Sequence, residues 1–83
     1  MTDAAFEASV IAIVADTFSV PPERIERHTT ADDVDGWDSL GHSILLARLS
    51  KKLRLRIGED IAAQSRNVGD LIDRLAAVRS EAG

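Results

Sequence analysis

Apolar residues recur along the chain at helical spacing. In residues 3–18 they return every three or four positions, which predicts a helix with one buried face, and Thr2 or Asp3 can cap its start. The apolar face of this predicted helix comprises Phe6, Val10, Ile13, Val14 and Thr17, with Phe18 at its edge. Pro21 and Pro22 then prevent its continuation, because proline lacks an amide donor and restricts the residue before it.

A long connection is predicted over residues 19–38. Such a connector is unusual in a small compact domain unless it is functional or is held to the core by its own apolar residues. Ile25, Val34 and Trp37 are the expected anchors, since a lone tryptophan usually packs against the body of its domain. Trp37 can also edge a partner surface, and the two roles are compatible.

Helical spacing resumes over residues 39–53. Ser39 can begin this helix by accepting a hydrogen bond from a free backbone amide. The expected core stripe consists of Leu45, Leu46, Leu49 and Leu53. Helical phase places a second apolar strip, expected to be partly exposed, on another face, where it comprises Leu40, Ile44 and Ala47 together with Lys51 and is flanked by Arg48.

The remaining pattern adds one short helix and one long helix. Residues 59–63 can form a single helical turn, and Asn67 can cap a final helix. The apolar face of that helix comprises Val68, Leu71, Ile72, Leu75 and Val78. Residues 53–57 alternate with arginines as a strand would, but a lone strand has no partner. The pattern therefore predicts an all-α fold, a small four-helix bundle with three longer helices and one short helix, in a single domain over residues 1–83.

Composition narrows the class of protein. A chain of 83 residues is small for an enzyme with a deep cleft, and 45% hydrophobic with 29% charged residues is typical of a compact fold. There is no cysteine, which excludes disulfides and thiolate metal sites and favours a cytoplasmic location. No apolar run approaches the roughly 18 residues of a membrane span, and the amino terminus carries acids where a targeting signal carries bases.

Charge is distributed unevenly. The net charge of -4 combines nine acids and two bases in residues 1–38 with five bases and no acid in residues 39–58. The molecule should therefore be electrically polarised, with its positive charge on the second predicted helix.

The most informative segment runs from Asp35 to Ser43 and reads D-G-W-D-S-L-G-H-S. Asp38-Ser39-Leu40, at the end of a long loop and the start of the second helix, resembles the D-S-L motif of acyl and peptidyl carrier proteins. The tripeptide alone is a weak signal. The resemblance extends over nearly the whole chain, however, and includes the leucine-rich helix, the 53–57 exit and the last helix after Asn67.

The resemblance implies a carrier of this family and fold type. A phosphopantetheinyl transferase would join a 4'-phosphopantetheine arm from coenzyme A to Ser39. A helix start favours the resulting phosphodiester, because unpaired amides and the positive end of the dipole lie there. Asp38 would help the transferase recognise the site, although it can equally be a solvated acid that favours the helix start. Leu40 would offer partners an apolar contact.

The implied protein is a carrier and not an enzyme, expected to be monomeric and to bind neither nucleic acid nor membrane. Its partners would be the transferase, an acyl- or aminoacyl-loading ligase or adenylation enzyme, and ketosynthase, condensation or acyltransferase enzymes. The pathway stays open among polyketide, nonribosomal peptide, aminoacyl and specialised fatty acid synthesis.

Other functions use the same residues. Ser39, His42 and Asp38 could form an esterase triad, but the segment lacks the G-x-S-x-G elbow and so small a domain has little room for a substrate cleft. Helical phase instead turns His42 toward the core stripe. His28 and His42 lack the spacing of metal ligands, so no metal site is expected. The second hypothesis, after the carrier, is a helical adaptor protein without a covalent group. Under this hypothesis the position of the D-S-L motif would be a coincidence.

The basic second helix departs from many fatty acid carriers, whose second helix is acidic. Arg48, Lys51 and Lys52 would repel the basic patches that such carriers meet. We therefore expect partners with apolar or acidic docking surfaces, in a dedicated pathway. The same bases can simply be solvated, and they also suit a phosphate-binding helix, but the overall acidity and the few aromatics disfavour nucleic acid.

Overall fold

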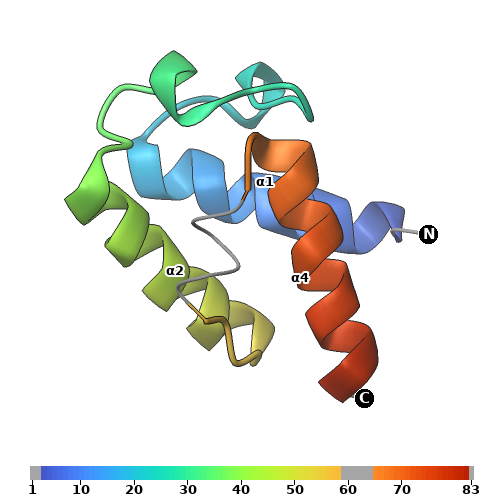
Figure 1. Cartoon of the computed structure of the whole chain (residues 1–83). Helices are drawn as coiled ribbons and strands as arrows, with labels where there is room; N and C mark the ends of the chain where they lie inside the picture. The colour runs from blue at the N-terminus through green and yellow to red at the C-terminus, as the bar shows by residue number, and fades with distance from the viewer. Residues whose placement is uncertain (1–2, 59–64, 83) are drawn as a thin grey trace.

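The computed structural model describes residues 3–58 and 65–82. Its elements, in chain order, are helix α1 (Ala4–Phe18), the 3-10 turns η1 (Pro22–Arg24) and η2 (Ala31–Asp33), and helices α2 (Ser39–Leu53) and α4 (Val68–Ala82). Both α2 and α4 pack on α1, while the long loop crosses one end of the helices (Figure 1). No strand occurs among these residues, so the all-α prediction is confirmed. The short helix predicted over 59–63 lies outside the described residues.

The core takes one face from each of the three helices. Its largest fully buried side chains are Val10 and Val14 from α1, Leu45 and Leu49 from α2, and Val68, Leu71, Ile72 and Leu75 from α4. Caps fix where two of these helices begin. The Asp3 carboxylate accepts the Ala5 amide at 2.9 Å, and the Asn67 side chain accepts the Asp70 amide at 2.8 Å, as the sequence predicted.

The predicted core stripe of α2 needs a correction. Leu46 and Leu53 are only half-buried, whereas Leu55, which lies beyond the helix, is buried. Leu46 borders the groove beside Trp37. Leu55 is buried because of the way α2 ends, where Arg54 adopts a left-handed backbone with φ 55° and the Leu55 amide donates to the Ser50 carbonyl at 3.1 Å. This Schellman geometry reverses the chain and turns the following apolar side chain back onto the helix.

The long loop is held down by its own apolar residues, as predicted. Ile25 and Val34 are buried, and Trp37 is half-buried against the core. The loop also bonds to the last helix, because the Val68 amide donates to the Thr29 carbonyl at 2.9 Å. A segment without long helices is thereby fixed in place at the end of the bundle that carries Ser39.

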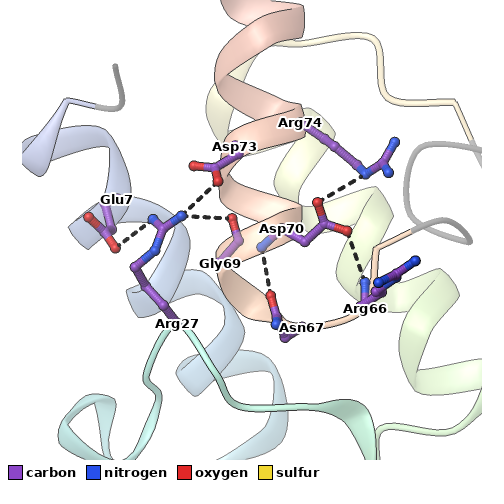
Figure 2. A network of polar contacts seen from close by, with 8 residues as sticks. All are labelled: Glu7, Arg27, Arg66, Asn67, Gly69, Asp70, Asp73 and Arg74. Atoms are coloured by element: carbon purple, nitrogen blue, oxygen red, sulfur yellow. Dashed lines mark hydrogen bonds and ion pairs between the residues drawn. The ribbon is translucent and has the colours of Figure 1, made fainter.

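Arg27 is the polar centre of this attachment (Figure 2). Its guanidinium donates to Glu7 of α1 at 3.1 Å, and to Asp73 at 2.7 Å and the Gly69 carbonyl at 3.3 Å in α4. The Gly69 amide returns a bond to the Arg27 carbonyl at 2.8 Å. The hydrogen bond to Asp73, with that to Glu7, raises the pKa of Arg27 above its usual value. One loop residue thus links the first and last helices.

Candidate functional site

Asp38 caps the helix that begins at Ser39. The Asp38 carboxylate accepts the Gly41 amide at 2.8 Å, and its backbone carbonyl accepts the His42 amide at 2.8 Å. The sequence correctly predicted that the helix begins at Ser39, but the expectation that Ser39 itself caps the helix was wrong. A carboxylate suits this position because its charge complements the helix dipole. Ser39 is consequently the first helical residue, and it is exposed.

Two glycines allow the loop to lie directly on the first turn of α2. Gly36 has φ +89°, a conformation that side chains disfavour. A Cβ atom added at Gly41 would stand 2.1 Å from the Gly36 carbonyl oxygen and 2.9 Å from Phe18 Cε1. Sequence reasoning missed this contact. The only sign of this contact in the sequence is that Gly36 precedes the Asp38-Ser39 pair and Gly41 follows it.

Trp37 anchors the loop through two contacts. Its ring stacks on Phe18, with centroids 5.2 Å apart and planes inclined by 18°. Its indole Nε1–H donates to His42 Nδ1 at 3.0 Å, from loop to helix. The anchoring role predicted for Trp37 is confirmed, and His42 is half-buried, as its helical phase indicated.

The same bond argues against an esterase triad. Because Nδ1 accepts from Trp37, the neutral imidazole carries its proton on Nε2, where a general base for Ser39 would need a lone pair. A triad acid would accept from the imidazole nitrogen that faces away from the serine, but His42 Nδ1 is bonded to Trp37 and the Asp38 carboxylate to the Gly41 amide.

An open groove of about 550 Å³ lies beside Ser39. Its walls are formed by Ala31, Trp37, Asp38, Ser39, His42, Ser43 and Leu46. The α2 members are spaced at i, i+3, i+4 and i+7 from Ser39 and therefore share one helical face. The structure thus brings Asp38, Ser39 and His42 to one groove. From the sequence, these three residues were linked only through the disfavoured esterase triad.

The predicted partner-binding residues form a different face of α2. Leu40 is 72% exposed and Ile44 is 45% exposed, and these are the large hydrophobic side chains most open to solvent among the described residues. Ala47, Arg48 and Lys51 are exposed as well. Arg48 is not a free cation, however, because it forms an ion pair with Asp16 of α1 at 2.9 Å.

Neither a metal centre nor a membrane span is found in the part of the chain that the structure describes. Residues 3–58 and 65–82 contain no group of three or more histidines or carboxylates placed to hold a metal ion. Within the same ranges, every helix is too short or too polar to cross a bilayer. The cytoplasmic location expected from the sequence stays a prediction.

Comparison with known proteins identifies the family. A family profile described as phosphopantetheine attachment site matches residues 8–75, which cover most of α1, the loop, α2 and the first half of α4. No curated protein matches the chain significantly. Members of the family carry 4'-phosphopantetheine covalently, and their carrier domains are generally not catalytic. The chain belongs to this family of acyl and peptidyl carrier proteins.

Proposed function

We propose that this protein is a single-domain acyl, aminoacyl or peptidyl carrier whose 4'-phosphopantetheine arm is attached to Ser39. The observation that carries the proposal is the exposure of Ser39 on the first turn of α2, within the matched residues. Ser43 lies in the same groove, but its hydroxyl donates to the Ser39 carbonyl at 3.2 Å. Ser39 is therefore the better acceptor of the two.

The surroundings of Ser39 fit a phosphodiester. The first-turn amides of α2 point out of the helix end, and the dipole there is positive. Asp38 introduces a negative charge next to the site, and its carboxylate takes up one of these amides, that of Gly41, at 2.8 Å. Asp38 is also exposed, which makes it available for recognition by the transferase.

Attachment needs no catalytic group from this chain. The Ser39 oxygen forms a bond to the phosphorus of coenzyme A that bears pantetheine, the bond from that phosphorus to the second phosphate breaks, and 3',5'-adenosine bisphosphate leaves. The hydroxyl proton passes to a base on the transferase. The thiol of the arm supplies the thioester that holds cargo, so the chain serves its partner enzymes as a substrate.

Partner enzymes would dock on the exposed strip of α2. Leu40 and Ile44 offer apolar contacts, and Lys51 lies at the far end of the same face. The ion pair with Asp16 leaves Arg48 less available, so Lys51 and Lys52 are the main positive charges that α2 itself offers a partner. Such a surface suits loading, condensing or acyl-transferring enzymes with apolar or acidic docking sites, in a dedicated polyketide, nonribosomal peptide or specialised fatty acid pathway.

Intact mass spectrometry tests the attachment residue. The parent chain, Ser39→Ala and the matched control Ser43→Ala are incubated with coenzyme A, magnesium and a broad-specificity transferase. We expect one phosphopantetheine on the parent and on Ser43→Ala, and none on Ser39→Ala. Modification of folded Ser39→Ala, or a folded parent that stays unmodified, would refute the proposal.

A binding titration tests the partner surface. A housekeeping fatty acid ketosynthase is titrated with the phosphopantetheinylated protein and with its Lys51→Glu/Lys52→Glu variant. The parent should bind weakly, and the charge-reversed variant should bind more tightly, because two repulsive contacts become attractive. Tight binding of the parent that weakens steeply with added salt would contradict the dedicated-pathway assignment.

A further inference from the structure

The His42 imidazole lines the same groove as Ser39. Its Nδ1 accepts from the Trp37 indole at 3.0 Å, and the two rings lie near-parallel, inclined by 21° with centroids 6.3 Å apart. This bond fixes both the orientation of the ring and its tautomer, so the proton resides on Nε2. The proton is on the nitrogen that Trp37 does not occupy.

Helix geometry brings that donor close to Ser39. Residues three apart on a helix have Cβ atoms about 5–6 Å apart. Side chains in a helix also lean toward its amino terminus, which points His42 back toward the first turn. Both residues line the same groove, as expected from this spacing.

Competing side-chain donors in the groove are already engaged. The Trp37 indole donates to His42, and the Ser43 hydroxyl donates to the Ser39 carbonyl at 3.2 Å. Asp38 is a carboxylate and adds negative charge. Among the residues that line the groove, Nε2–H of His42 is thus the side-chain donor best placed to meet an anion bonded to Ser39.

We propose that His42 Nε2–H donates a hydrogen bond to the phosphodiester on Ser39, with Trp37 as the positioning residue that holds the imidazole in the required tautomer. The inference rests on the proposed attachment at Ser39. A hydrogen bond to an anionic oxygen is stronger than a neutral one. The contact would hold the first bonds of the arm against α2 and so set the direction in which the arm leaves the protein.

NMR of the protein before and after phosphopantetheinylation tests the contact. Long-range 1H–15N spectra report the two imidazole nitrogens, and 31P spectra report the phosphodiester. On modification, the His42 Nε2–H resonance should shift downfield, while that of His28 should not, because His28 is 80% exposed and pairs with Glu26 in the loop. In His42→Phe, which keeps a planar ring, the 31P resonance should move away from its parent position.

Two further variants separate contact from structure. His42→Gln keeps an amide donor and should return the 31P resonance toward the parent value. Trp37→Phe removes the indole donor, so the 15N spectrum of unmodified protein should show a mixture of His42 tautomers.

Mass spectrometry distinguishes a failure of the proposed function from a failure of the His42 contact. If a folded parent gains no arm, the proposed function fails. If the arm is attached at Ser39 but the His42 resonances stay at their unmodified positions, or His42→Phe leaves the 31P resonance unchanged, the His42 contact is refuted while the carrier function stands.

Discussion

Replacing Gly41 by alanine should destabilise the protein although alanine favours helices. The added Cβ would lie 2.1 Å from the Gly36 carbonyl oxygen, more than 1 Å short of ordinary contact, and 2.9 Å from Phe18 Cε1. The first obstacle is backbone, so the loop itself must move. That movement would displace Trp37, which stacks on Phe18 and bonds to His42.

The magnitude follows from two opposing effects. Overpacking of this kind costs about 1–3 kcal/mol. Alanine in place of glycine returns at most about 1 kcal/mol of helix propensity, and less in a first turn. Because the atom 2.1 Å away is backbone, the overpacking cost should lie in the upper part of its range, and we expect a net loss of about 1–2 kcal/mol. With a urea m-value of about 1 kcal/mol/M for so small a domain, the unfolding midpoint should fall by about 1–2 M.

Urea unfolding followed by fluorescence measures this directly, because Trp37 is the chain's one tryptophan and lies at the perturbed contact. The matched control is Ala47→Gly, which removes a Cβ from an exposed position of the same helix and should cost about 1 kcal/mol. Alanine should thus make the protein more stable than glycine does at position 47, and less stable at position 41. If Gly41→Ala is as stable as the parent or more stable, the loop does not lie on the helix as described.

Three other changes test the fold around the site. Arg27→Ala should lower the free energy of unfolding, measured in urea, by about 1 kcal/mol at low salt and by less at high salt, because the side chains of Arg27, Glu7 and Asp73 are 47%, 27% and 53% exposed. A larger, salt-independent loss would contradict an ionic role. Ser19→Gly should raise the thermal midpoint by the equivalent of about 0.5–1 kcal/mol, because Ser19 ends α1 in a left-handed backbone at φ 56°, and a lowered midpoint would refute that geometry. The Thr30 amide, and then its hydroxyl, hold the pKa of Asp33 below the 3.8 that is usual for an aspartate. The ionised Asp33 carboxylate therefore stabilises the fold above pH 3.8, and this contribution is lost as the pH falls through the lower pKa of the folded protein. Carboxyl NMR titration should show a midpoint below 3.8 that rises in Thr30→Ala. A midpoint unchanged by Thr30→Ala would exclude the contribution of the hydroxyl.

Periodicity was sufficient to predict the helices, because each buries one face. The boundaries of α1 and α2 and the buried pair Leu45 and Leu49 follow directly from apolar residues spaced three and four apart. Leu46 and Leu53 were wrongly placed in the fully buried stripe, and Leu55 was not assigned to the core. Periodicity describes a helix in isolation, and it contains neither the groove beside Trp37 that leaves Leu46 half-buried nor the reversal at Arg54 that buries Leu55.

The site was predicted in its residues but not in its contacts. The exposed start of α2 at Ser39 could be inferred from a loop, a cap and a motif. The Trp37–His42 bond and the approach of Gly36 to Gly41 could not, since both join a loop of irregular backbone to a helix. Asp38 and Ser39 are both good capping residues, so local preference could not decide between them.

The contacts of Arg27 with both α1 and α4 limit how this domain can be truncated or exchanged. Its side chain and backbone hold Glu7 at one end of the sequence and Gly69 and Asp73 at the other, while the loop that contains it leads to Ser39. A fragment truncated before Asp73 would retain the D-S-L motif yet lose part of the support for the segment that presents it. A transplant into a chimeric synthase should therefore exchange α1 through α4 as one piece.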